Sequence, residues 1–120
     1  MADGPLIGFK ILDLSSVISG PFCTQLLGDL GADVIKVESP DGDSMRKNIG
    51  PRRGGLAAGF LNFNRNKRSI VIDAKKEHGR DLIRRLAVKA DAFIENNRPG
   101  VAERIGLGYG DIRRSNPKIV

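Results

Sequence analysis

The residues best suited to chemistry in this sequence are cations that surround one short apolar run. The stretch FNRNKRSIVIDAKKEHGR has three cations before the run SIVIDA and two after it, namely Arg65, Lys67, Arg68, Lys75 and Lys76. Lys and Arg side chains in the loops beside a strand are typical of sites that bind phosphate or carboxylate groups. The pattern therefore predicts an anion site at the ends of a strand.

The 120 residues carry a formal net charge of +6, and the positive excess lies in the middle of the chain. Between Arg46 and Arg85 there are twelve Lys or Arg residues and three Asp or Glu residues. A basic patch can indicate nucleic-acid binding, but aromatic residues make up only 5% of the chain and do not alternate with the cations. We expect no nucleic-acid partner, and we interpret Arg80, Arg84 and Arg85 as the solvent-facing side of a helix.

Other kinds of site lack the residues that they need. The single histidine, His78, and the single cysteine, Cys23, exclude a soft-metal site and an internal disulfide, so we expect no metal and a cytoplasmic location. The turn LSSVISGPFC has one glycine where a dinucleotide fingerprint needs three, and GLGYG does not follow a strand. No apolar stretch approaches the roughly 20 residues that cross a bilayer, so no membrane association is expected.

Strands alternate with helices along the chain. The apolar runs predict strands at 9–14, 33–38, 60–63, 69–74, 91–96 and 118–120. Helical periodicity or short helical turns are predicted at 19–32, 76–90, 101–106 and 110–115, and residues 39–59 are predicted to form a long loop. This order favours one α/β domain of Rossmann-like type, with a mostly parallel sheet and flanking helices.

The first predicted helix, SGPFCTQLLGDLGA, contains signals for both of its ends. Ser19 or Gly20 can cap it, Pro21 suits its first turn, and Gly31 can close it in a left-handed conformation. An apolar stripe at spacings of three and four runs along it, formed by Phe22, Leu26, Leu27 and Leu30. In the helix at 76–90 the corresponding stripe is Leu82, Ile83, Leu86 and Ala87. Ligands of parallel sheets bind beyond the carboxyl ends of the strands, here the segments after Leu14, Glu38, Asp73 and Glu95.

Four blocks, in this order, resemble the amino-terminal portion of the class III coenzyme A transferases, the group of formyl-CoA transferase, carnitine-CoA transferase and alpha-methylacyl-CoA racemase. The blocks are GFKILDLSSVISGPFCTQLLGDLGADVIKVESPDGD, NFNRNKRSIVIDAKKEHGR, IENNRPGVAERIGL and NPKIV. The asparagines in NRNKRS favour the transferase branch over the racemase branch. The resemblance implies that residues 1–120 are the CoA-binding Rossmann-like part of a larger domain, and that the full-length form is a homodimer of interlocked chains.

The resemblance also implies which residues contact coenzyme A. Carried over by motif, these are Ile18, Ser19, Ser39, Ile72, Lys75, Asn96, Asn97, Arg104 and Ile105. Lys75 and Arg104 would meet phosphate, whereas Ile72 and Ile105 would line the adenine or else belong to the core. The chain departs from relatives at three of these positions: Ile18 replaces a glutamine, Ser39 an arginine and Asn97 a common aromatic residue.

In the family, CoA passes between an acyl-CoA and a carboxylic acid through an aspartate that forms a mixed anhydride and then a thioester. That aspartate corresponds to a position beyond Val120, and Asp13, Asp33 and Asp73 fall at noncatalytic positions of the matching blocks. No catalytic residue is therefore expected within this sequence, and we predict that it is inactive by itself. The alternatives are a noncatalytic module that binds CoA or a nucleotide, and a member of the racemase branch.

Overall fold

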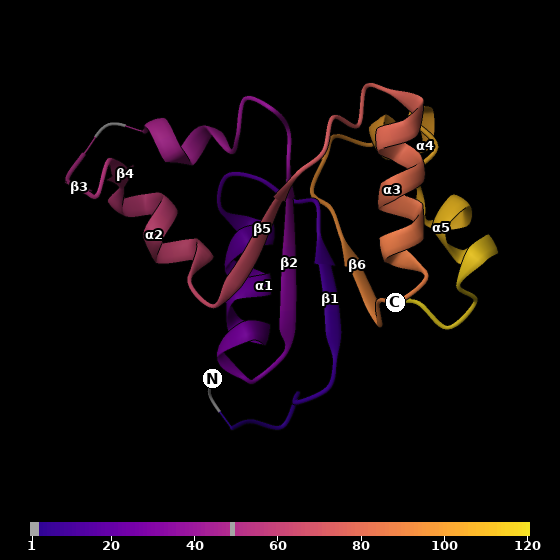
Figure 1. Cartoon of the computed structure of the whole chain (residues 1–120), viewed down its shortest axis with the longest axis horizontal. Coiled ribbons are helices and arrows are strands. Elements are labelled where there is room, and N and C mark those ends of the chain that lie inside the picture. Colours follow the sequence, from indigo (N-terminus) through magenta and orange to yellow (C-terminus); the bar gives the residue numbers. More distant parts are fainter. Residues whose placement is uncertain (1–2, 49) are drawn as a thin grey trace.

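A four-stranded parallel sheet with strand order β5-β2-β1-β6 forms the centre of the computed structural model, which describes residues 3–48 and 50–120 (Figure 1). Its strands are β1 (Lys10–Asp13), β2 (Asp33–Glu38), β5 (Lys67–Val71) and β6 (Ala92–Ile94). β1 lies in the middle, with Leu12 opposite Ile35 of β2 on one side and opposite Phe93 of β6 on the other. The predicted α/β class with a parallel sheet and flanking helices is confirmed.

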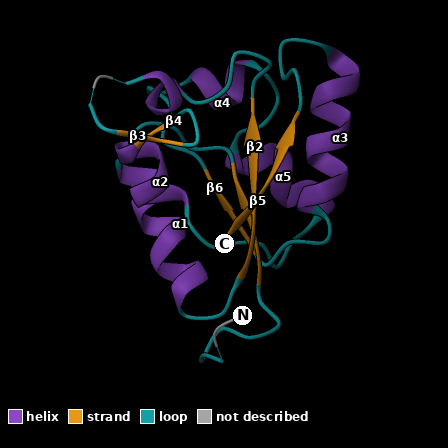
Figure 2. Cartoon of the chain, turned by 60° about the vertical axis from the view of Figure 1, so that its left-hand side comes forward, coloured by secondary structure: helices purple, strands orange, loops and turns teal. Residues whose placement is uncertain are grey.

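Helices cover both faces of this sheet (Figure 2). One face is covered by α1 (Ser19–Asp29), with α2 (Ala58–Asn64) beside it. The other face is covered by α3 (Glu77–Ala87) and α5 (Tyr109–Ser115). A short helix, α4 (Val101–Arg104), lies just before α5 in the chain. No helix in the described ranges is long and apolar enough to cross a membrane.

The hydrophobic core consists of two clusters, one on each face of the sheet. Leu12 and Val37 pack with Ile83 of α3 and Ile112 of α5, whereas Ile11 belongs to the cluster on the α1 side. Because successive strand residues point to opposite faces, Ile11 and Leu12 serve different layers. This explains why the central strands carry apolar residues toward both faces.

The apolar stripe of α1 does not face the sheet. Phe22, Leu26 and Leu30 are 46%, 46% and 44% exposed, and only Leu27 joins the core on that side. The buried residues of α1 are instead Gly20, Pro21, Thr24, Gln25 and Gly28. The sequence pattern identified an apolar face, but small and polar side chains let this helix approach the sheet closely.

The segment between β2 and β5, predicted as a long loop at 39–59, contains regular secondary structure. It contains a 3-10 helix, η1 (Ser44–Lys47), and a two-stranded hairpin, β3 (Arg52–Arg53) and β4 (Leu56–Ala57), before α2 begins. The prediction of a strand at 60–63 is wrong, because these residues lie within α2. A run of four residues is too short to distinguish the helical period from the strand period. Tertiary contacts decide the structure here: Phe60 is buried beneath the Arg46 guanidinium, and Phe63 packs edge-on against Phe22.

Element boundaries differ in smaller ways. β5 begins two residues before the predicted start at Ser69, and Ile18, with no side-chain cap, is the N-cap of α1 in place of Ser19 or Gly20. Gly31 has the predicted left-handed conformation, with φ of 100°. No strand forms at the predicted position 118–120, and only Val120 bonds along β6: its N–H donates to Asp91 O at 3.1 Å and its carbonyl accepts from Phe93 N at 2.9 Å.

Candidate functional site

The direction in which the chain adds strands to the sheet reverses between β1 and β6. The chain runs from β1 through α1 to β2 on one side, whereas β6 lies on the opposite side of β1. Asn96 joins the two strand ends: its Oδ1 accepts from Ser16 N at 2.9 Å, and its Nδ2 donates to Ser16 O at 2.8 Å and to Ser19 Oγ at 3.3 Å. Ligands of open α/β sheets bind at such a switch point.

The first turn of α1 lies directly against this point. A Cβ on Gly20 would lie 2.1 Å from Ser15 Cβ and 3.4 Å from Asn96 Cγ, so only glycine permits this approach. Ile18 is 49% exposed and Ser19 is also exposed. The turn therefore presents an apolar side chain, a hydroxyl and the amino end of a helix at the predicted ligand position.

Lys75 and Arg104 come from different segments that α3 brings to the same region. Arg80 Nη1 donates to Lys75 O at 2.9 Å, and Arg84 Nε, one helical turn further, donates to Gly106 O at 3.2 Å. The side chains of Lys75 and Arg104 are exposed, and within residues 3–48 and 50–120 neither forms an ion pair. They are thus two cations whose charge is available to a ligand.

The remaining predicted contacts have different environments. Ile72 is 6% exposed within the core cluster and Ile105 packs against that cluster, so the structure places both in the core environment that the sequence left open. Ser39 is exposed and lines a cavity of about 330 Å³ together with Ser16 and Asp43. Asn97 donates from its backbone and side-chain nitrogens to Glu95 Oε2, at 2.8 and 2.9 Å.

Arg65, Lys67 and Arg68, at and just before the start of β5, are each paired with an acid. Arg65 pairs with Asp29 and Arg68 pairs with Asp33, each at 2.6 Å. Lys67 is buried, with Nζ 3.1 Å from Asp13 Oδ2, and it also donates to Pro21 O and Asn64 Oδ1. Acids of the same chain already neutralise these cations, which argues against the expected anion site on this side of the strand.

Buried charges at the strand ends were missed by the sequence analysis. Lys36 Nζ lies 2.9 Å from Asp43 Oδ2, with 2% and 1% of the two side chains exposed, and it donates to Ser15 O at 2.9 Å. Asp13 also accepts from the hydroxyls of Ser15 and Thr24. The available signal was the presence of charged residues inside the apolar runs KILDL and DVIKVE, since charged residues are rarely buried unless they are paired.

Glu38 is the most strongly perturbed acid of this group. Burial by itself would raise the pKa of Glu38, but hydrogen bonds from Arg46, from the Asp43 N–H and from the Ser69 hydroxyl outweigh that effect and lower the pKa from 4.5 to about 2. Arg46 binds both carboxylate oxygens, with Nε–Oε2 and Nη2–Oε1 distances of 2.7 and 2.6 Å. The carboxylate therefore stays ionised and fixes the loop that follows β2.

The chain belongs to CoA-transferase family III, which it matches over residues 6–120. It is 48% identical over 117 residues to the human succinyl-CoA:glutarate CoA-transferase, a match that covers 97% of this chain and 27% of that protein. It is 43% identical over 116 residues to the formyl-CoA:oxalate CoA-transferase of Afipia carboxidovorans, covering 96% of this chain and 27% of the relative.

A solved structure agrees with this family membership. The crystal structure of a CAIB/BAIF family protein from Brucella suis superposes with a TM-score of 0.92 at 44% identity, covering 99% of this chain and 32% of that one. The chain therefore spans less than a third of the length of these relatives.

Proposed function

We propose that this chain is the CoA-binding amino-terminal part of a class III CoA-transferase, which moves CoA between an acyl-CoA and a carboxylic acid. The observation that carries the proposal is that Lys75 and Arg104 are exposed and have no ion pair within the described residues, whereas Lys36, Lys67, Arg65 and Arg68 are paired with acids. The names of the relatives support the substrate class, because both name an acyl-CoA and a carboxylic acid or its anion.

The proposed binding mode follows from where these groups lie. CoA carries a diphosphate and a ribose 3'-phosphate, and charge-assisted hydrogen bonds from Lys75 and Arg104 would bind them. The pantetheine arm would run toward Ile18 and Ser19, whose turn Asn96 fixes to the end of β6. Ile105, which keeps part of its surface exposed, is better placed than buried Ile72 to contact the adenine.

The catalytic carboxylate is proposed to come from outside residues 1–120. The buried aspartates near the switch point are already engaged: Asp13 contacts Lys67, Ser15 and Thr24, and Asp43 contacts Lys36. A nucleophile must reach the thioester carbonyl, and these carboxylates are held inside the protein. The proposal extends to a homodimeric full-length form located in the cytoplasm.

Binding is tested by titrating CoA and dephospho-CoA into the folded chain by isothermal calorimetry. Each of Lys75→Ala and Arg104→Ala should weaken CoA binding at least tenfold, because one lost charge-assisted contact costs about 1.5–3 kcal/mol. Dephospho-CoA should bind more weakly than CoA, and added salt should weaken both. Lys89→Ala, which removes an exposed cation near the amino end of β1, is the matched control and should leave the affinity unchanged.

Two results would contradict the proposal. Equal affinity for CoA and dephospho-CoA, or no binding of either, would remove the phosphate argument. A lower melting temperature with unchanged affinity in the two alanine variants would make Lys75 and Arg104 structural. Mass spectrometry of the chain with an acyl-CoA and a carboxylic acid should detect no new acyl-CoA, and turnover would mean that a carboxylate within residues 1–120 is the nucleophile.

A further inference from the structure

Val17, immediately before the N-cap of α1, has a backbone conformation that its side chain disfavours. Its φ is 71°, and among the described non-glycine residues only Asn66 also has a positive φ. Asparagine tolerates the left-handed region, whereas a β-branched residue there is a genuine outlier. Such a conformation persists only where the surroundings hold it.

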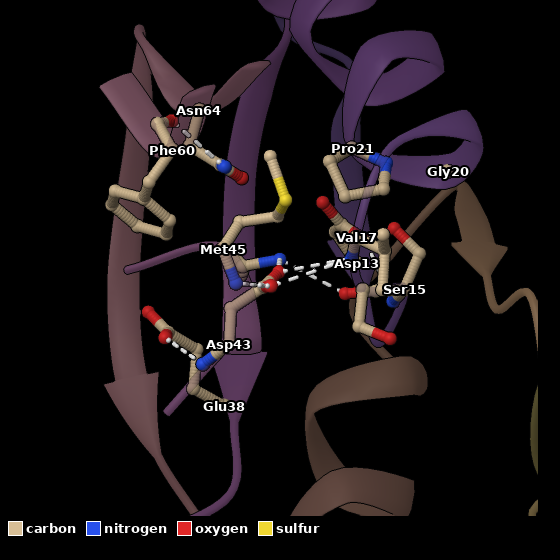
Figure 3. Close-up of polar contacts among 12 residues, drawn as sticks. Asp13, Ser15, Val17, Gly20, Pro21, Glu38, Asp43, Met45, Phe60 and Asn64 are labelled. Carbon is tan, nitrogen blue, oxygen red and sulfur yellow. Dashed lines mark hydrogen bonds and ion pairs between the residues drawn. The ribbon is translucent and has the colours of Figure 1, made fainter. Parts of the chain in front are cut away.

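The Asp43 carboxylate contacts the backbone of Val17. The Val17 N–H points at the Asp43 carboxylate, 3.4 Å from both Oδ1 and Oδ2 (Figure 3). Asp43 is itself fixed, since Oδ1 accepts from Met45 N at 3.0 Å and its own N–H donates to Glu38 Oε2 at 2.9 Å. The loop after β2 therefore supplies a rigid acceptor for the turn after β1.

Lys36 connects the Asp43 carboxylate to the backbone carbonyl of Ser15. Its Nζ lies 2.9 Å from Asp43 Oδ2 and donates to Ser15 O at 2.9 Å, with both charged side chains almost completely buried. Asn96 binds the N–H and carbonyl of Ser16 from β6. The backbone of 15–17 is thus held from two neighbouring strands, and the strained residue is the one bound by Asp43.

We propose that Asp43, held by Lys36, is a positioning residue that keeps Val17 left-handed and so aims Ile18 and Ser19 at the ligand. This inference rests on the proposed function, in which Ile18 and Ser19 contact CoA. Without the carboxylate, Val17 would relax to negative φ and turn the following residues away from the switch point. Apparent affinity would then fall in proportion to the fraction of molecules that keep the competent turn.

Calorimetric titration with CoA, performed on three variants of the whole chain, tests this. Asp43→Asn should weaken CoA binding by about tenfold, because the amide cannot present two acceptor oxygens to Val17 and no longer neutralises Lys36. Val17→Gly alone should leave affinity unchanged, since glycine adopts positive φ without strain. The double variant Val17→Gly/Asp43→Asn should recover at least half of the lost binding free energy while remaining as thermally destabilised as Asp43→Asn.

That separation distinguishes positioning from a structural role. If Asp43 only stabilises the fold, Val17→Gly cannot restore affinity, and the absence of rescue overturns the inference. Asp41→Asn, an exposed acid two residues away, is the matched control and should bind CoA like the wild type. If Asp43→Asn fails to fold, Lys36→Met/Asp43→Asn, which leaves no buried charge unpaired, replaces it, with and without Val17→Gly.

Amide hydrogen exchange of Val17, followed by NMR, separates this inference from the proposed function. The Val17 N–H should be protected in the wild type and exchange at least tenfold faster in Asp43→Asn. If the wild type binds no CoA, the proposed function is overturned, and exchange then decides whether Asp43 holds the turn. Equal exchange in the two proteins, or equal CoA affinity of wild type and Asp43→Asn, overturns the inference.

Discussion

Glu38 should make the stability of this fold depend on acid in a predictable way. Its side chain is 3% exposed, and it accepts two hydrogen bonds from Arg46, one from the Ser69 hydroxyl and one from the Asp43 N–H. These bonds hold the pKa of Glu38 at about 2 in the folded protein, below its ordinary value of 4.5. Because the folded value is lower, ionised Glu38 stabilises the fold above pH 4.5 and this stabilisation is lost as the pH falls toward 2.

The size of the effect follows from the two pKa values. Each unit of difference corresponds to about 1.36 kcal/mol, so the full contribution is about 3 kcal/mol, of which about 2 kcal/mol should be lost by about pH 3. Urea unfolding followed by circular dichroism should be performed on wild type and Glu38→Gln across this range. The difference between the two free energies of unfolding should shrink as the pH falls, because the other acids titrate in both proteins.

The matched control is Glu103→Gln, which removes an exposed carboxylate that has no ion pair within the described residues. It should change the free energy of unfolding by less than about 0.5 kcal/mol. A wild-type minus Glu38→Gln difference that stays constant from about pH 6 to about pH 3 would show that Glu38 is not ionised and paired as described. The loop after β2 would then need another anchor.

Two further stability predictions have controls within the chain. Gly20→Ala should lower the free energy of unfolding by about 1–3 kcal/mol and weaken CoA binding, because the added Cβ would lie 2.1 Å from Ser15 Cβ. Gly110→Ala, whose added Cβ would have no atom within 4 Å, should instead raise the free energy of unfolding by about 0.5–1 kcal/mol. Asp13→Asn should lower the free energy of unfolding by about 3–5 kcal/mol, because it leaves buried Lys67 without its carboxylate partner. Asp33→Asn should lower it by less than about 1 kcal/mol, because the Asp33 side chain is 42% exposed. Urea unfolding measures all four, and equal costs within either pair would refute its explanation.

The sheet was predictable because its central strands are buried on both faces. A strand with helices on each side carries apolar residues toward both faces, as Ile11 and Leu12 of β1 and Val34 and Ile35 of β2 do. Helix α1 was predictable from its end signals and periodicity, and α3 from its periodicity. The carboxyl ends of the strands followed from the parallel order alone, and they are where Ile18, Ser39, Lys75 and Asn96 lie.

What the sequence could not reveal depends on contacts between distant segments. Residues 60–63 were predicted as a strand but lie in the helix at 58–64, because that helix depends on Phe60 packing under Arg46 and Phe63 packing on Phe22. The exposed stripe of α1 was equally hidden, since periodicity locates an apolar face without stating what covers it. The partners of Lys36 and Lys67 lie 7 and 54 residues away in the sequence, and only the fold brings them together.

The cations of this chain illustrate why pairing decides more than net charge. A formal charge of +6 suggests one basic surface, yet Lys36 and Lys67 neutralise buried aspartates, and Arg65 and Arg68 pair with acids near the amino end of the sheet. These pairs fix the backbone and offer little field to a ligand. A phosphate is attracted most where positive charge remains uncompensated, and the sheet topology places ligands at the carboxyl ends of its strands. Both conditions are met at Lys75, in the loop that follows β5, which is why the proposed CoA site includes Lys75 and not Arg65, Lys67 or Arg68.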